Sequence, residues 1–162
     1  MSADDELAVA ATVYRYALGI DSRDWVLYRS IFADAVVIDF TSYGGGAAST
    51  MAADEWVASV RPLFTGLDAT QHTMSNPMAE VVGDRATCRM YMQAHHVLDP
   101  DDPASWFTIG GYYDDLLVRS PDGPRGWLLA GVTLTVLWRR GDASIMPVAR
   151  EMGLRHLGRD GG

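Results

Sequence analysis

The first part of the chain has apolar residues at helical spacing. Four of them lie four, three and four positions apart: Leu7, Ala11, Tyr14 and Leu18. This spacing predicts a helix over 5–20 with one apolar face. Three residues further along, the same face reaches Asp21. A second, short helix is predicted over 24–32, with Asp21 or Ser22 as its cap.

From residue 35 onward the period changes to two, which is typical of strands. The first alternating run places Val36, Ile38 and Phe40 on one face. A helix over 50–64 follows, with Trp56, Val57 and Val60 facing inward. Four long alternating runs then predict strands over 70–82, 85–98, 105–119 and 126–138. A last amphipathic helix is predicted over 144–157, followed by a flexible tail over 158–162.

Helices followed by a long meander of strands indicate an α+β fold. Strands of about 13 residues exceed the usual length of about 5–6 and must bend to pack. We therefore expect N-terminal helices packed on a strongly curved antiparallel or mixed sheet that encloses a pocket. Residues 1–142 are expected to form one domain, and 143–162 a C-terminal segment with a short helix and a flexible tail.

Polar residues on apolar faces are the first candidate site residues. The face of the strand over 70–82 that carries His72 also carries Met74, Asn76 and Met78. A buried imidazole needs partners for both ring nitrogens, and a carboxylate suits the one that carries a proton. Asp21, at the end of the first helix's apolar face, is the best candidate for that partner. The alternative is that Asp21 only caps the next helix.

Two further strands carry candidates. His96 continues an Ala and Met face of the strand over 85–98 and is either a satisfied core histidine or a pocket residue. Tyr113 and Asp115 share one face of the strand over 105–119, and Tyr113 either directs its hydroxyl into the pocket or is a core residue. The last strand has an entirely apolar face that predicts pocket wall or core, formed by Leu128, Ala130, Val132, Leu134, Val136 and Trp138.

Composition excludes several kinds of chemistry. The net charge of −8 and the pI near 4.7 make nucleic acid an unsuitable partner. All thirteen basic residues are arginines, and the absence of lysine excludes Schiff-base, pyridoxal-phosphate and P-loop chemistry. The single cysteine, Cys88, excludes an intrachain disulfide and a multi-cysteine zinc site.

No metal or other cofactor is expected. His95 and His96 point to opposite faces of a strand and cannot chelate one metal together. The chain has neither a His-Glu-x-x-His motif nor a Gly-x-Ser-x-Gly nucleophile elbow. The acidic N-terminus over 1–6 does not look like a signal peptide, and no apolar run is long enough to cross a membrane. We therefore expect no membrane association and a cytoplasmic location.

Four segments, which together span most of residues 7–140, resemble the nuclear-transport-factor-2-like (SnoaL-like) superfamily, and more closely its scytalone dehydratase branch. They are Ile20-Asp21-Ser22-Arg23-Asp24-Trp25, Val37-Ile38-Asp39-Phe40, Thr70-Gln71-His72 and Gly126-Trp127 through Trp138. The resemblance implies a cone-shaped fold around a pocket.

The resemblance also implies roles for three residues. An aspartate at the position of Asp21 holds a histidine at the position of His72, which acts as the general base, and a histidine matching His96 assists. Dehydrochlorinases of the superfamily share the Asp–His pair. The chain departs from the branch where its two carbonyl-polarising tyrosines fall on Ile20 and Phe40. The branch's serine and asparagine of the fourth strand likewise fall on Tyr113 and Asp115.

These observations predict a cofactor-independent lyase of the dehydratase type. His72 removes a proton next to a carbonyl, Asp21 sets its tautomer, and His96 or Tyr113 donates a hydrogen bond or proton. The expected substrate is a small hydrophobic, cyclic or polyketide-like molecule. Its predicted contacts are Tyr14, Phe40, Met74, Asn76, Tyr113 and Asp115.

Three alternatives remain open. An isomerase or a polyketide cyclase would use the same base, and a non-catalytic binding protein would use only the pocket. We also expect a homo-oligomer, a dimer or trimer, formed through the outer faces of the strands. Those faces carry Tyr91, Tyr112, Leu116 and Thr135.

Overall fold

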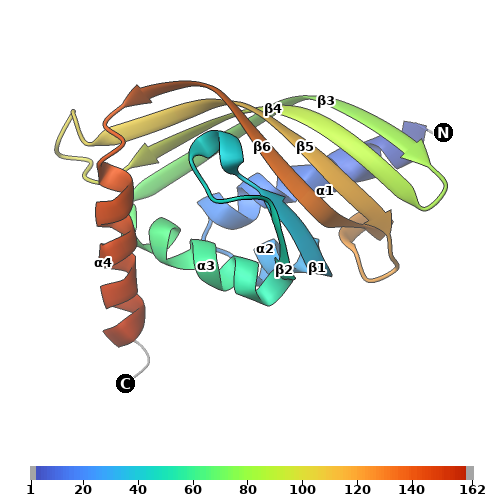
Figure 1. Cartoon of the computed structure of the whole chain (residues 1–162), viewed down its shortest axis with the longest axis horizontal. Helices are drawn as coiled ribbons and strands as arrows, with labels where there is room; N and C mark the ends of the chain where they lie inside the picture. Colours follow the sequence, from blue (N-terminus) through green and yellow to red (C-terminus); the bar gives the residue numbers. More distant parts are fainter. Residues whose placement is uncertain (1–2, 160–162) are drawn as a thin grey trace.

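The computed structural model describes residues 3–159, and Figure 1 shows the course of the chain. The elements are α1 (Ala3–Asp21), α2 (Trp25–Ser30), β1 (Phe32–Asp39), η1 (Thr41–Tyr43), β2 (Ser49–Ala52), α3 (Ala53–Gly66), β3 (Ala69–Val82), β4 (Arg85–Val97), β5 (Trp106–Arg119), η2 (Pro124–Gly126), β6 (Trp127–Gly141) and α4 (Ile145–Arg159). No helix of the described part is long and apolar enough to cross a membrane.

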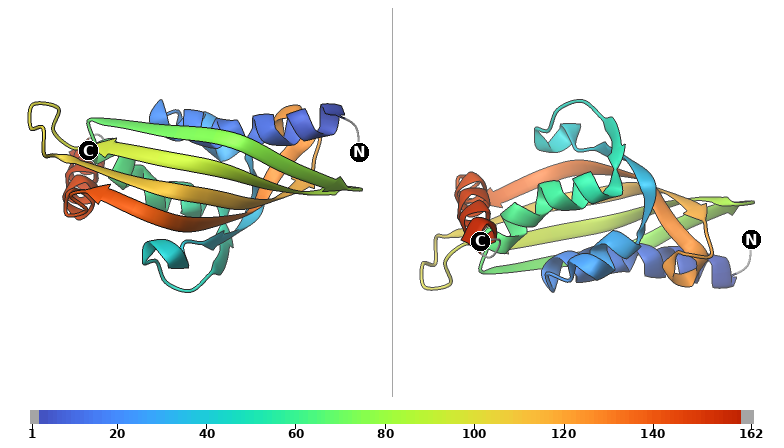
Figure 2. Two further views of the ribbon diagram at one scale, coloured as in Figure 1. Left: turned by 90° about the horizontal axis from the view of Figure 1, so that it is seen from above. Right: turned by 90° about the horizontal axis from the view of Figure 1, so that it is seen from below.

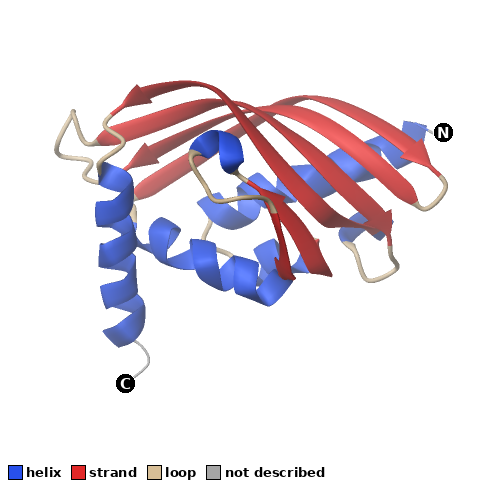
Figure 3. Cartoon of the chain, in the orientation of Figure 1, coloured by secondary structure: helices blue, strands red, loops and turns tan. Residues whose placement is uncertain are grey.

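One six-stranded sheet, in the order β2-β1-β6-β5-β4-β3, forms the back of the molecule. β1 runs parallel to β6, and the other neighbouring strands are antiparallel. Figure 3 shows the sheet arching over the helices, with α1, α2 and α3 on its concave side and α4 across one end. The predicted α+β fold with a curved mixed sheet is confirmed.

The core lies between the concave face of the sheet and the helices. Its largest fully buried side chains include Trp127 of β6, Tyr28 of α2 and Phe32 of β1. Figure 2 shows α1 running alongside β3, the edge strand, in both of its views. The C-terminal end of α1 and the start of β3 therefore lie next to each other, although about 50 residues separate them along the chain.

The buried face of α1 is not the face that the sequence pattern predicted. Three residues of the predicted face are exposed, at 68%, 42% and 57%: Leu7, Tyr14 and Leu18. A second set at the same spacing is buried instead: Val9, Val13, Tyr16 and Ile20. The buried side of the helix also contains Thr12, which donates to the carbonyl oxygens of Ala8 and Pro124 (both 3.0 Å). These hydrogen bonds satisfy the hydroxyl group of Thr12, so this polar residue can lie on the buried side of the helix.

Two helix starts differ from the prediction. The helix expected over 50–64 begins at Ala53, because residues 49–52 form the short strand β2 beside β1. α2 is capped by Asp24, whose side chain accepts from the amide of Leu27 at 2.9 Å. The predicted caps, Asp21 and Ser22, were wrong, and the Asp21 carboxylate is available to other partners.

β-Bulges in two strands change which face of the sheet the following side chains point to. In β3 the register shifts between Ser75 and Met78, and Asn76 has a left-handed φ of 54°. Met78 therefore points outward and is 55% exposed, although strict alternation predicted it to be buried with His72.

In β6 the register shifts opposite Leu116/Leu117 and again opposite Gly110/Gly111. Trp127 and Leu129 are buried at the start of β6 in place of the predicted Leu128 and Ala130, and Trp138 at its other end is 40% exposed. The predicted apolar face of this strand is therefore correct only in its middle, around Val132 and Leu134.

The C-terminal helix extends further than predicted. α4 covers Ile145–Arg159, whereas a helix over 144–157 and a flexible tail over 158–162 were expected. Gly158 and Arg159 are helical, and the remainder of the predicted tail lies outside the described residues.

Candidate active site

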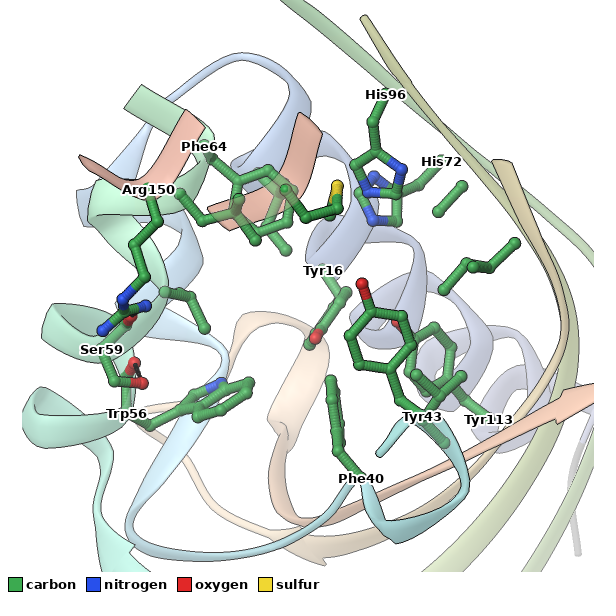
Figure 4. A pocket seen from close by; sticks show the side chains of 17 residues that line it. Tyr16, Phe40, Tyr43, Trp56, Ser59, Phe64, His72, His96, Tyr113 and Arg150 are labelled. Atoms are coloured by element: carbon green, nitrogen blue, oxygen red, sulfur yellow. Dashed lines mark hydrogen bonds between the residues drawn. The ribbon is translucent and has the colours of Figure 1, made fainter. Parts of the chain in front are cut away.

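A pocket of about 240 Å³ lies between the concave face of the sheet and α1, α3 and α4. Its walls are largely aromatic and aliphatic. The aromatic members include Phe40, Trp56 and Phe64, and the aliphatic members include Ile20, Leu134 and Met146. Polar side chains enter this apolar space at a few places only, which is the usual composition of a small-molecule site. Figure 4 shows the labelled members of the wall around the cavity.

Asp21 contacts His72, which lines the pocket, through two hydrogen bonds. Nδ1 of His72 lies 2.7 Å from Oδ1 of Asp21, and the backbone amide of His72 donates to Oδ2 at 2.6 Å. The His72 side chain is only 4% exposed, while that of Asp21 is 22% exposed. The hydrogen bond predicted between these two residues is therefore present.

The hydrogen bonds of Asp21 determine the tautomer of His72. Burial acts to raise the pKa of Asp21, but the hydrogen bonds and charge of His72 and the hydroxyl of Thr70 outweigh it, and the pKa is lowered. The carboxylate is thus ionised at neutral pH and can only accept hydrogen bonds. Nδ1 of His72 therefore carries a proton, and in the neutral ring the lone pair lies on Nε2, which is the tautomer that a base acting through Nε2 needs.

Arg23 stabilises the segments around Asp21 through several hydrogen bonds. Its side chain donates to the carbonyl oxygen of Phe64 at 2.8 Å and to that of Asp21 at 2.9 Å, and to Thr70 Oγ1 at 2.8 Å. A guanidinium group cannot accept a hydrogen bond, so the Thr70 hydroxyl accepts from Arg23 and gives its own proton to Asp21 Oδ1, at 3.0 Å. Thr70 therefore bonds the same carboxylate oxygen as the His72 ring, and Arg23 holds Thr70 and the Asp21 carbonyl group in place.

His96 lies beside His72 but has a different electrostatic state. The two ring centroids are 6.0 Å apart, and Nδ1 of His96 lies 3.0 Å from the carbonyl oxygen of Phe107. Burial, and secondly the proximity of His72, lower the pKa of His96 to about 4. His96 is neutral at pH 7, with its proton on Nδ1 because the carbonyl only accepts. Nε2 is then an acceptor, so neutral His96 does not supply the donor that the sequence suggested.

Tyrosine hydroxyl groups are hydrogen-bond donors in the pocket wall. Tyr16 is hydrogen-bonded to both Tyr113 and Tyr28, and burial raises the pKa of Tyr16 and of Tyr113 well above 10. Tyr43, in η1, is half-buried, and desolvation raises its pKa although Arg139 acts in the opposite direction. Figure 4 shows the Tyr43 hydroxyl directed into the pocket, towards the side where His72 and His96 lie. Tyr16, Tyr43 and Tyr113, which line the pocket, thus keep their hydroxyl protons at neutral pH, and Tyr16 and Tyr113 are already hydrogen-bonded to each other.

Two of the six predicted substrate contacts, Phe40 and Tyr113, line the pocket. Tyr14 does not, because it lies on the exposed face of α1. Met74 packs against the core outside the pocket lining. Asn76 is in the β3 bulge and lines a separate hollow on the outer face of the sheet.

Asp115 lies on the inner face of β5 beyond Tyr113, 3% exposed, and does not line the pocket. Its Oδ1 atom is buried without a hydrogen-bond partner. Burial raises the pKa of this carboxyl well above its usual range. Asp115 is a core residue, and the prediction that it contacts substrate was wrong.

Four polar members of the wall were missed from the sequence: Tyr16, Tyr43, Ser59 and Arg150. Tyr16 belongs to the second apolar set of α1, which has the same spacing as the set that was chosen. Tyr43 stands before three glycines, a composition that predicts a loop. No group of three or more His, Cys, Asp and Glu residues suited to a metal ion occurs within residues 3–159.

Comparison with known proteins assigns the fold to a family. Residues 1–133 match the model of the SnoaL-like domain. The chain belongs to the SnoaL-like family. Scytalone dehydratase arp1 of Aspergillus fumigatus is 26% identical to it over 141 residues, which cover 83% of each chain.

Solved structures share the fold. The Kfla4162 protein from Kribbella flavida superimposes with a TM-score of 0.81 at 28% identity, covering 88% of this chain and 97% of that one. Hexachlorocyclohexane dehydrochlorinase LinA-type3 from Novosphingobium barchaimii has a TM-score of 0.66 at 16% identity, covering 87% of this chain and 92% of that one. A relative named scytalone dehydratase suggests an enzymatic role for members of the family.

Proposed function

We propose that this SnoaL-like protein is a cofactor-independent lyase of the dehydratase type, with His72 as its general base. The observation that carries the proposal is the double contact of Asp21 with His72, at 2.6 Å to the backbone amide and 2.7 Å to the ring. In the neutral, nearly buried imidazole this contact places the proton on Nδ1 and the lone pair on Nε2, beside an apolar pocket. A positioned base of this kind typically accelerates proton transfer by about 10²–10⁴.

In the proposed reaction, Nε2 of His72 takes a proton from the carbon next to a carbonyl group. The electron pair of the broken C–H bond forms an enolate. The enolate then collapses to a carbon–carbon double bond and expels the hydroxyl group at the β position. The proton on Nε2 goes to that leaving oxygen, so that water is released and His72 returns to its starting state.

The Tyr43 hydroxyl suits the role of the donor to the developing enolate oxygen. It is protonated at neutral pH and lines the pocket together with His72. His96, neutral and with an accepting Nε2, suits a different role: it would accept a hydrogen bond from the substrate's hydroxyl group and orient it. Asp21 would act through His72 as a positioning residue.

The pocket favours a small, flat, cyclic substrate. Its volume of about 240 Å³ limits the ligand to a few fused or linked rings, and aromatic side chains such as Phe40, Trp56 and Phe64 suit the faces of those rings. A short polyketide-like aromatic compound has this shape. Scytalone itself is a poor fit to the expected contacts, because Ile20 and Phe40 cannot donate hydrogen bonds.

An isomerase is the second candidate, and one observation favours it. With a pKa of about 4, His96 is not a proton donor at neutral pH. The proton that His72 removes therefore stays on His72 until it is passed on. Returning it to a different carbon would give isomerisation with the same residues, and ring closure of the enolate would give a cyclase.

We further propose that the protein is a homo-oligomer, a trimer or dimer, assembled through the outer face of the sheet. The face exposes apolar side chains on three neighbouring strands, including Tyr91, Leu116 and Leu137 at 45%, 52% and 61%. Exposed apolar surface of this kind is unusual for a solvated face. The cytoplasmic location stays a prediction.

One experiment separates the candidate functions. Bicyclic β-hydroxy ketones would be incubated with the protein in deuterium oxide and followed by proton NMR. Elimination gives vinyl signals, whereas isomerisation or reversible proton removal gives deuterium at the activated carbon without loss of the hydroxyl group. If neither is seen, while the same compounds bind, the pocket is a binding site without chemistry. The matched control is His72→Ala, which should abolish both reactions.

A further inference from the structure

Arg150 on α4 places a permanent positive charge at the pocket. Among the described residues that line the cavity it is the one arginine. Its Nη1 donates to the carbonyl oxygen of Ser59 at 2.8 Å, and it forms no ion pair with a carboxylate within residues 3–159. Arg155, one turn further along the same helix, is paired with Glu151 at 3.4 Å. Arg150 and Arg155 thus differ in whether their charge is matched.

The position of Arg150 is set by close packing of α4 on α3. A side chain at Gly66 would overlap the carbonyl oxygen of Ala149, and one at Gly153 would overlap that of Pro62. The two helix backbones therefore meet without side chains between them. Arg150 follows Ala149 directly, so this contact holds its backbone at the edge of the pocket. The guanidinium group is then presented from a fixed element and not from a loop.

The remainder of the wall does not compensate the charge. His96 is neutral, and the tyrosines that line the pocket are neutral. No carboxylate is among the described residues that line the cavity, and Asp21, next to His72, is engaged by His72 and Thr70. Figure 4 shows Arg150 with Ser59 and Trp56 on one side of the cavity, and His72 and His96 on the other. A ligand that fills the cavity would therefore lie between a base and a cation.

We propose that Arg150 binds a carboxylate group of the substrate while the carbon to be deprotonated lies at His72. The proposal rests on the proposed function in that it names the substrate class for the same pocket: a cyclic carbonyl compound that also carries a carboxylate. A planar guanidinium with free N–H groups matches a carboxylate in geometry as well as charge. Arg150 lies beyond residues 1–133, which match the family model, so this specificity would belong to the C-terminal helix of this chain.

Binding of matched acids and amides tests the proposal without any turnover. Benzoate, cinnamate and 2-naphthoate, each with its primary amide, would be titrated calorimetrically into the wild-type protein at pH 7. We expect at least one acid to bind about tenfold more tightly than its amide, as a charge-assisted contact predicts. Arg150→Gln should remove this preference, while Arg150→Lys should retain part of it because the charge remains. Arg155→Gln is the matched control, since it removes a charge from the same helix, and should leave the preference unchanged.

Three results would overturn the proposal. They are equal affinity for acid and amide in the wild-type protein, no binding by any of the acids, or an equal effect of Arg155→Gln and Arg150→Gln. The experiment is also independent of the catalytic proposal. His72→Gln should lose turnover and keep the preference for acids, so a failed base and a failed carboxylate site give different results.

Discussion

Asp21 holds His72 at two points: one carboxylate oxygen accepts from the backbone amide and the other from the ring. The first contact joins the end of α1 to β3, and the second fixes the rotation of the imidazole within that frame. The ring therefore cannot turn without breaking a hydrogen bond to a charged acceptor, which typically costs about 1.5–3 kcal/mol. This double contact underlies the first two predictions.

Removing either partner of the pair should abolish activity and leave the fold largely intact. His72→Ala opens space in a pocket wall that water or ligand can enter, so the cavity penalty is small. Asp21→Asn keeps the shape but offers an amide where the ring needs a carboxylate. We expect rate losses of about 10²–10⁴ for both, measured as turnover, with small shifts in melting temperature.

The contrary outcome would be equally informative. If the pair is structural, each substitution leaves a buried polar group unpaired, at about 1–3 kcal/mol, and lowers the melting temperature by several degrees. Melting and turnover should be measured on the same samples. His96→Ala, for which we expect a smaller rate loss than at His72, provides the comparison within the same pocket.

Thr70→Val should lower kcat by about three- to tenfold with little change in KM, because one hydrogen bond to the Asp21 carboxylate is lost. Valine has nearly the shape of threonine, so packing is preserved. Thr70→Ser, which restores the hydroxyl, should recover most of the rate. Equal values of kcat for Thr70→Val and Thr70→Ser would show that the hydroxyl does not position Asp21.

The sequence identified those features that depend on local alternation. The long strands and the overall α+β order follow regular patterns. Asp21 and His72 are polar residues that interrupt such patterns, so all of these features could be recognised. The prediction of Asp21 extended the wrong face of α1, however, because two apolar sets with the same spacing interleave in this helix. Only tertiary contacts, such as that of Thr12 with Pro124, distinguish the buried set.

The remaining errors arise where nonlocal geometry decides. The left-handed conformation of Asn76 allows a bulge that reverses the facing of the residues after it, and an asparagine in a strand does not by itself predict this. Arg150 looks like an ordinary surface residue of an amphipathic helix. It reaches the pocket only because Gly66 and Gly153 bring two helices together from distant parts of the sequence.

His96 should make the protein less stable in acid within a defined range. Its pKa is about 4 in the folded protein and about 6.5 when unfolded. Between these values the unfolded chain binds a proton that the folded protein does not. The free energy of unfolding should therefore fall by up to about 3 kcal/mol as the pH decreases from 6.5 to 4.

Urea unfolding at a series of pH values measures this dependence. His96→Gln, which does not titrate, should flatten the curve over that range. The lowered pKa of Asp21 acts in a separate, more acidic range: its contribution is present above its ordinary value of 3.8 and is lost as the pH falls below it. An unchanged slope in the His96→Gln protein would contradict the assignment.

Light scattering should detect a dimer or trimer at micromolar concentration. Leu116→Glu and Leu137→Glu each place a charge on the outer face of the sheet and should shift the mass towards that of the monomer. Val26→Glu is the control, because Val26 is 83% exposed on α2, on the helical side. A wild-type protein that scatters as a monomer would refute the assembly.

The contact between Gly66 and Gly153 also gives a means of redesigning the pocket. Any side chain at either position must push α4 away from α3, and the residues that α4 contributes to the wall, Met146 and Arg150, would move with it. A graded series from glycine to alanine to serine should therefore enlarge the cavity in steps while the Asp21–His72 pair, on other elements, stays in place. Libraries that seek to extend the range of accepted ligands would best begin at these two glycines, at a distance from the reacting groups.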